Sequence, residues 1–257
     1  GSWASGSVYP TTTYLGSGVG SNGFLYSIGG NTTSALGTEC YKYNVATDTW
    51  SPIASLPAGR RIHATAVVGN FVYAIGGSDM TPPGVYQSTV YKYDIAGNSW
   101  STVAPLPITI GWGRAVAYNN NYIYVAGGVD AATGGNYLNT VYLYNVTTNT
   151  WTTATPMPGA VFGGAFGIVG NKLVYAAGAA PTGITNTVYV GTIDAGNPAL
   201  ISWTTMANPY PGINTQVTSQ YGANLAELML TQSVGGNNHS PDAVAYPPGA
   251  MYRIHAA

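Results

Sequence analysis

The chain has 257 residues, and only 15 of them are charged, which leaves a net charge of −1 at pH 7. This balance excludes the basic surface that nucleic-acid binding requires, and the absence of any apolar run of eighteen residues excludes a membrane-spanning helix. With 35 Gly, 16 Pro and 21 Tyr, and with polarity supplied mainly by Thr, Ser and Asn, the composition predicts an all-β protein with many tight turns.

The N-terminal segment has neither the basic start nor the apolar stretch of a signal peptide. We therefore expect that an exported protein would have this chain as its mature form. The sequence from Trp3 to about Val8 instead predicts a β-strand, and Tyr9-Pro10 follows it. The single Cys40 rules out an intramolecular disulfide framework.

A repeat of about 50 residues organises the rest of the chain. Its first element is a hydrophobic run that ends in a pair of small residues, and its second is a short strand with Tyr at a fixed place. A Trp follows, and then a segment that contains Pro. The hydrophobic run occurs five times, at residues 24–30, 71–77, 122–128, 173–178 and 228–236, and the Tyr is Tyr41, Tyr91, Tyr142, Tyr189 and Tyr252.

The Trp of the repeat occurs as Trp50, Trp100, Trp151 and Trp203, and the fifth repeat ends before its own. The missing Trp is found at the other end of the chain, as Trp3. The sequence is thus circularly permuted relative to its repeat, and the periodic Trp residues are expected to pack between neighbouring repeats.

These features together resemble the kelch repeat, in which each repeat forms one four-stranded antiparallel blade of a β-propeller. The resemblance implies a single propeller domain over residues 1–257. The expected blades span about 11–55, 60–105, 111–156, 161–207 and 211–257. The N-terminal strand 3–8 is expected to pair in the last blade and close a five-bladed ring, in preference to a fragment of a longer array.

In a propeller, the loops between second and third strands and the segments that cross to the next blade share one face, which commonly carries binding residues. We expect these loops at residues 31–38, 78–88, 129–139, 179–186 and 237–250. Aromatic planes and amide groups there are typical of a sugar site. The candidate ligand-binding residues are Trp112, Tyr86, Tyr137, Arg60, Arg114, Asp79, Asp130, Asn237 and His239.

Each candidate also has a structural interpretation. Asp79 and Asp130 follow a Gly pair, where turn residues are common, and Arg60 belongs to a pattern that braces neighbouring blades in kelch repeats. Trp112 departs from the period of the other Trp residues. It either contributes to binding or fills the channel.

The sequence favours a non-catalytic protein without a cofactor. His63, His239 and His255 form no metal-binding motif with the single cysteine, and Cys40 lies beside Tyr41 rather than opposite a channel Tyr, unlike the copper site of galactose-oxidase-like kelch proteins. A kelch-type oxidase or sugar epimerase remains an alternative.

The leading hypothesis is an extracellular or cell-surface module for adhesion, with a carbohydrate or protein as its ligand. The second is a structural subunit of an extracellular filament or surface layer, which would self-assemble when the N-terminal strand completes the fifth blade of a neighbour. The low charge favours both.

Overall fold

The computed structural model describes residues 6–32, 36–79, 85–130 and 135–207, together with the backbone of 228–231 and 251–254. All the regular secondary structure in these ranges is β-strand, as the composition predicts. No helix in the described part of the chain is long and apolar enough to span a membrane.

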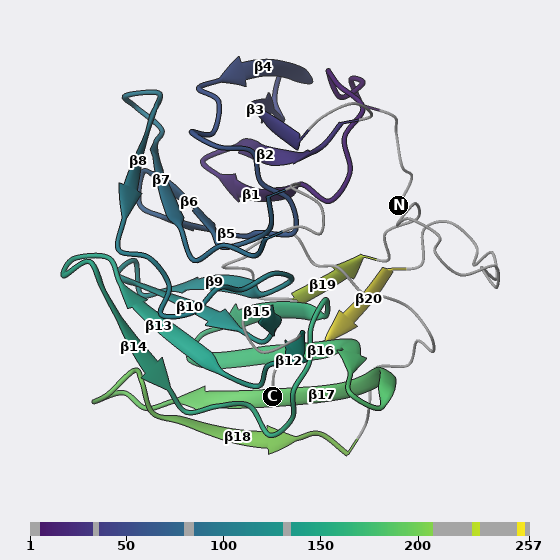
Figure 1. The fold of residues 1–257 in the computed structure, drawn as a ribbon, viewed down its shortest axis with the longest axis vertical. Helices are drawn as coiled ribbons and strands as arrows, with labels where there is room; N and C mark the ends of the chain where they lie inside the picture. The colour runs from purple at the N-terminus through teal and green to yellow at the C-terminus, as the bar shows by residue number, and fades with distance from the viewer. Residues whose placement is uncertain are drawn as a thin grey trace.

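Four antiparallel sheets of four strands follow one another around a centre (Figure 1). Each is one blade, with its strands in sequence order from the inside outward. Blade 1 has β1 (Ser17–Ser21), β2 (Phe24–Asn31), β3 (Leu36–Asn44) and β4 (Thr49–Ile53), and blade 2 has β5 (Ala64–Val68), β6 (Phe71–Ile75), β7 (Val90–Asp94) and β8 (Ser99–Val103). Blade 3 has β9 (Arg114–Tyr118), β10 (Tyr122–Ala126), β13 (Val141–Asn145) and β14 (Thr150–Ala154), and blade 4 has β15 (Ala165–Val169), β16 (Lys172–Ala180), β17 (Gly183–Ile193) and β18 (Ile201–Thr205).

Two further pairs of strands complete the described elements. β11 (Val129–Asp130) and β12 (Asn136–Tyr137) form a small hairpin above blade 3. β19 (Leu228–Thr231) pairs antiparallel with β20 (Met251–Ile254), and Leu230 lies opposite Tyr252. β19 contacts β15 of blade 4, and Figure 1 draws this pair between blade 4 and blade 1.

The blades are held together by apolar layers between their faces. Alternation along each strand sends one set of side chains to each neighbouring blade. Tyr26 and Ile28 of β2 pack with Val72 and Ala74 of β6, and all four are buried. The next two seams repeat this arrangement with Tyr73 and Ile75, and then with Tyr124 and Ala126.

Three of the periodic Trp residues, Trp100, Trp151 and Trp203, lie in these seams as the sequence predicts, and Trp3 lies outside the described residues. In each seam, the indole N–H donates to the carbonyl oxygen of the residue four positions beyond the preceding Trp. The three bonds are Trp100 to Ala54 at 2.8 Å, Trp151 to Ala104 at 2.9 Å and Trp203 to Thr155 at 3.0 Å.

The pair of small residues in or just after each second strand has left-handed backbone, which the crowding at that point requires. Gly77 has φ of +89°, and a Cβ there would lie 2.6 Å from the carbonyl oxygen of Arg61. In blade 4, Ala177 takes the first position of the pair with φ of 59°. The glycine preference therefore follows from geometry that most side chains do not tolerate.

Two predicted loops are shorter than expected, because the strands beside them continue. In the loop expected at 179–186, β16 and β17 continue as a hairpin that turns at 181–182. In the loop expected at 31–38, β2 reaches Asn31 and β3 begins at Leu36, and these two residues pair. A register shift between Ala176 and Gly178 lets the ladder resume beyond the crowded small pair.

Candidate functional site

The segments that cross between blades lie on the same face as the loops between second and third strands. Each crossing segment forms a β-bridge to the residue just after a small pair. The bridges join Tyr14 to Asn31, Arg61 to Ser78, Gly111 to Val129 and Phe162 to Ala179. The structure thus brings the two sets of predicted binding segments together on one face, here called the loop face.

A chain of backbone hydrogen bonds on the loop face links the blades. The N–H of Ile62 donates to Leu15 O at 2.9 Å, the N–H of Trp112 donates to Ile62 O at 3.0 Å, and the N–H of Gly163 donates to Trp112 O at 3.5 Å. All four residues have left-handed φ angles between 50° and 69°. The backbone of Trp112 therefore occupies the same position in its blade as Leu15, Ile62 and Gly163 do in theirs. Only Trp112 among these four residues has an aromatic side chain.

Aromatic side chains gather next to Trp112. Its ring centroid lies 6.1 Å from that of Phe162 at an interplanar angle of 56°, and Tyr137 meets Phe162 edge to face at 4.8 Å. On the other side, Tyr86 lies against Gly111, where a Cβ would be 3.0 Å from Tyr86 Cε1. Tyr86, Trp112, Phe162 and Tyr137 are all half-buried, and we call these four residues the aromatic arc.

The two candidate arginines are turned into the protein. Arg60 is 5% exposed, donates from Nη1 to Gly59 O at 2.9 Å, and lies over the ring of Tyr91. Arg114 is also buried, and its Nε donates to Gly164 O at 2.8 Å, which braces blade 3 against blade 4. Burial lowers the pKa of the Arg114 guanidinium from its ordinary value. Arg114 thus joins two blades, whereas Arg60, for which bracing was expected, donates to the residue before it.

The two candidate aspartates already accept hydrogen bonds, Asp79 from its own loop and Asp130 from the crossing segment that precedes blade 3. Asp79 accepts hydrogen bonds from Val85 N at 3.0 Å and from Gln87 Nε2 at 2.9 Å, which fixes the ends of the blade 2 loop. Asp130 is buried on β11 and accepts a bond from Thr109 Oγ1 at 3.3 Å. Asn237 and His239 lie outside the described residues.

Two residues of the loop face were not among the predicted site residues. Phe162 connects Trp112 to Tyr137, and its bridge to Ala179 makes it the blade 4 counterpart of Gly111. Asn31 is fully buried after the Gly29-Gly30 pair. Repeat alignment of the crossing segments would have selected Phe162, because its counterparts Tyr14, Arg61 and Gly111 all face the same loops.

Among the residues that the structure describes, no three His, Cys, Asp or Glu side chains could together hold a metal ion. His63 is buried, and burial together with the Arg60 charge lowers its pKa to about 3. Burial raises the pKa of the Cys40 thiol to about 11. Both groups are therefore neutral and inaccessible at pH 7.

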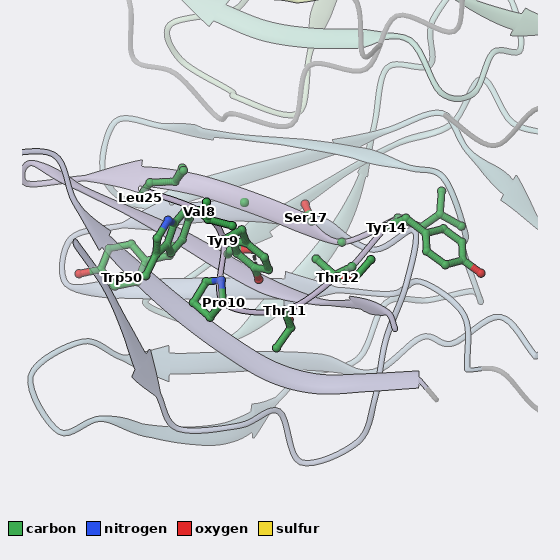
Figure 2. Close-up of a pocket in the computed structure, with 15 residues that line it drawn as sticks. Val8, Tyr9, Pro10, Thr11, Thr12, Tyr14, Ser17, Leu25 and Trp50 are labelled. Atoms are coloured by element: carbon green, nitrogen blue, oxygen red, sulfur yellow. Dashed lines mark hydrogen bonds between the residues drawn. The ribbon is translucent and has the colours of Figure 1, made fainter. Parts of the chain in front are cut away.

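A cavity of about 640 Å³ lies away from the aromatic arc, at the side of blade 1 that does not face blade 2. Residues 8–18 form one wall, and Leu25, Tyr26, Ser27 and Trp50 form the other (Figure 2). No charged residue lines it.

The comparisons with known proteins agree with this architecture. The KLHDC2/KLHL20/DRC7 Kelch-repeats domain family matches residues 62–219. The chain therefore belongs to the kelch-repeat β-propellers.

Among solved structures, the chain is similar to that of YjhT, with a TM-score of 0.67 and 22% sequence identity over 80% of this chain and 68% of the YjhT chain. No curated protein sequence matches it. At this identity the structural likeness defines the fold alone. Kelch propellers generally act as binding modules.

Proposed function

We propose that this propeller is a non-catalytic adhesion module that binds a neutral carbohydrate on its loop face. The observation that carries the proposal is the aromatic arc, in which two loops and two crossing segments of blades 2, 3 and 4 each contribute one half-buried ring to the loop face. Aromatic faces stack on the apolar faces of sugar rings, and such pockets add a few polar groups for orientation.

The charged candidate residues of the loop face favour a neutral ligand, and the half-buried Arg61 near Tyr86 is a cation that could donate to a sugar hydroxyl. The guanidinium groups of Arg60 and Arg114 are buried and donate to carbonyl oxygens of the protein, so neither presents an open fork to a carboxylate or phosphate. The carboxylate of Asp79 already accepts hydrogen bonds from its own loop, and that of Asp130 accepts one from Thr109 of the crossing segment. Recognition would therefore depend on ring stacking and on hydroxyl and amide groups, and a protein ligand is the alternative.

A glycan and polysaccharide binding screen tests this function. The full chain is compared with Trp112→Ala and with Thr102→Ala, which removes an exposed side chain on the outer strand of blade 2. We expect saturable binding that Trp112→Ala weakens by about five- to 150-fold, if stacking of a sugar ring on one aromatic contributes as much as the roughly 1–3 kcal/mol of a stacked base. Binding that Trp112→Ala leaves unchanged would place the site elsewhere, and no binding to any glycan would favour a protein ligand.

We further propose that the chain closes a five-bladed ring, with residues 3–8 as the outer strand of the last blade. The support comes from Ser7, which stands four residues beyond Trp3. The indole N–H of Trp50 donates to Ser7 O at 3.2 Å, which is the same contact that Trp100, Trp151 and Trp203 make with the blade before them. Ser7 thus occupies, on blade 1, the place that the end of a preceding fourth strand occupies on the other blades.

A second repeated contact supports the same closure. In the next two seams, Asn98 and Asn149 accept hydrogen bonds from the N–H groups of Ala54 and Ala104, at 2.8 and 2.9 Å. At blade 1 the counterpart is Asp48, which accepts from Ser7 N at 2.7 Å and from Tyr43 Oη at 2.5 Å. We call Ser7, Tyr43, Asp48 and Trp50 the latch.

Deleting residues 1–7 tests closure, because it removes the proposed strand and the Ser7 side of the latch. We expect a cooperative but clearly lower unfolding transition. An unchanged transition would contradict closure. We also propose an extracellular or cell-surface location, which the low charge and the Thr-rich and Asn-rich surface support; fractionation of cells that express the native gene would test it.

A further inference from the structure

The outer turn of blade 3 carries a sequence motif that the proposed sugar site does not use. Asn145, Val146 and Thr147 form the sequence Asn-X-Thr, which is an acceptor sequence for N-linked glycosylation when X is not Pro. Two other acceptor sequences occur in the chain, and they begin at Asn31 and Asn238. The one at Asn238 lies outside the described residues.

Asn145 and Asn31 differ in their access to solvent. Asn145 is the last residue of β13 and is half-buried, and residues 147–150, which follow it, are exposed. Asn31 is the last residue of β2 and is fully buried, and its backbone pairs with Tyr14 and with Leu36. An oligosaccharide on Asn31 would have to lie inside the protein, whereas one on Asn145 would extend from the turn into solvent.

The hydrogen bonds of the Asn145 side chain leave its amide nitrogen available. Oδ1 accepts from Thr147 N at 3.0 Å and from Thr148 N at 3.2 Å. Within the described part of the chain, both hydrogen bonds of this side chain use Oδ1. The nitrogen Nδ2 is the atom that carries the sugar in an N-linked glycan, so the turn and a glycan use different atoms of the same amide.

Blades 1 and 2 have the same turn without the acceptor sequence. Asn44 ends the third strand of blade 1, and its Oδ1 accepts from Ala46 N at 2.9 Å. Asp94 ends the third strand of blade 2, and its Oδ1 accepts from Ala96 N at 3.0 Å. The turn therefore requires the side-chain oxygen of Asn or Asp, but two of the three blades form it without a hydroxyl group two residues later.

The hydroxyl of Thr147 is thus the part of the motif that the fold does not require. It donates to Asn121 Oδ1 at 2.5 Å in an exposed hydrogen bond, and water can replace such a bond at little net cost. The need for a turn explains why residue 145 is Asn or Asp. It does not explain why Thr stands at 147, and an acceptor sequence does.

The turn lies at the end of blade 3 opposite the loop face. The third strand of the blade, β13, pairs antiparallel with both of its neighbours. Its start therefore lies beside the loop between second and third strands, and its end, at Asn145, lies at the far end of the blade. A glycan on Asn145 would leave the aromatic arc free to bind its ligand.

We propose that Asn145 is a site of N-linked glycosylation, to which an oligosaccharide is transferred from a lipid-pyrophosphate donor. The bond from Nδ2 to C1 of the first sugar forms, the bond from C1 to the pyrophosphate oxygen breaks, and Nδ2 gives one proton to a base of the transferase. This inference rests on the proposed extracellular location, because such transferases act on exported chains. A hydrated glycan would also favour the solubility of a surface with so few charges.

Expression of the full chain through the secretory pathway of a glycosylating eukaryotic cell tests the proposal. Thr147→Ala removes the hydroxyl and places Ala where the same turn has Ala46 and Ala96. Ala46→Thr is the reciprocal variant, since it completes an acceptor sequence at Asn44. Secreted protein is treated with peptide N-glycosidase in ¹⁸O water, which converts each glycosylated Asn to labelled Asp, and the label is located by peptide mapping.

We expect label at Asn145 in the wild type, none at this residue in Thr147→Ala, and new label at Asn44 in Ala46→Thr. Asn31 should stay unlabelled in all three, because it is buried, and circular dichroism should show the same fold. An unlabelled Asn145 in secreted wild type would overturn the proposal, and so would label at Asn145 that persists in Thr147→Ala.

Protein isolated from its native cells distinguishes this proposal from the location on which it rests. Fractionation gives the location, and mapping of the same sample gives the state of Asn145. If the chain is outside the cell and Asn145 is unmodified, the glycosylation proposal fails and the extracellular location stands. If the chain is inside the cell and Asn145 is unmodified, both fail.

Discussion

The indole N–H of Trp50 donates to the carbonyl oxygen of Ser7 across 3.2 Å, although 43 residues separate them in sequence. The bond matters because three other tryptophans make it with the blade before their own. It ties the first described residues of the chain to blade 1 in the manner of a preceding blade. The latch is therefore the contact that supports the proposed closure of the ring by the N-terminal strand.

Asp48 should make the latch sensitive to acid. Hydrogen bonds from Ser7 N and Tyr43 Oη hold the pKa of the Asp48 carboxyl below its ordinary value. Because the pKa is lower in the folded chain, the stabilisation is present above the unfolded value and is lost as pH falls through the folded value. We expect Asp48→Ala to lower the unfolding midpoint modestly at pH 7, with the loss shrinking toward pH 2.

Asp48→Asn is the matched control, since Asn98 and Asn149 hold this position in the next two blades. It should keep the latch at pH 7 and remove its share of the acid sensitivity. Thermal unfolding between pH 2 and 7 measures both variants. An Asn variant as unstable as the Ala variant at pH 7 would show that the carboxylate charge, rather than the hydrogen bonds, holds Ser7.

The buried His63 should give folding stability a second, separate dependence on pH. Its folded pKa of about 3 lies below the ordinary value of 6.5, so between these values the unfolded chain binds a proton that the native chain does not. Stability should therefore fall as pH drops from about 6.5, by roughly 1 kcal/mol per pH unit, and level off near pH 3. We expect His63→Gln to flatten urea-unfolding free energies over this window; an unchanged slope would mean that His63 is protonated while folded.

Two leucines at corresponding positions should differ in their contribution to stability. Leu173 on β16 is fully buried between blades 3 and 4, so Leu173→Ala should cost about 2–5 kcal/mol. Leu25 is half-buried in the wall of the cavity on blade 1, and Leu25→Ala should cost less than about 1 kcal/mol. Urea unfolding compares the two variants; equal losses of stability would show that Leu25 is packed as tightly as Leu173.

Alanine substitutions at Gly77 and Gly135 distinguish the cost of left-handed backbone from the cost of steric crowding. Both have φ near +89°, but a Cβ on Gly77 would meet Arg61 O at 2.6 Å, whereas nothing lies within 4 Å of one on Gly135. Gly135→Ala should cost about 1–2 kcal/mol from the left-handed backbone alone, and Gly77→Ala about 2–5 kcal/mol because the crossing segment must also move. Calorimetric midpoints that fall equally would contradict the crowding argument.

Much of the fold could be predicted from the sequence because its determinants repeat. The Trp and Tyr positions predict the seams, and the small pair predicts left-handed backbone, which even Ala177 adopts. The hairpin at 179–186 could not be predicted, since resumption of the ladder beyond a bulge depends on space above blade 4. The contacts of the fifth repeat beyond β19 and β20 likewise remain a prediction.

The candidate site could be predicted only in part. Trp112, Tyr86 and Tyr137 lie on the loop face as expected, and Phe162 joins them through ring contacts that link blades 3 and 4. Sequence spacing places Arg114 near this face but does not give the direction of its side chain. The bond from Arg114 Nε to Gly164 O depends on the approach of a neighbouring blade, which no local pattern encodes.

The most direct test of the binding proposal is a ¹H–¹⁵N spectrum of the tryptophan indoles during titration with a glycan found in the screen. The chain has six tryptophans, and the indoles of Trp50, Trp100, Trp151 and Trp203 donate to backbone carbonyls in the seams. We predict that the Trp112 signal shifts in proportion to occupancy while those four stay in place. Shifts confined to the seam tryptophans, with Trp112 unmoved, would contradict a ligand site on the aromatic arc.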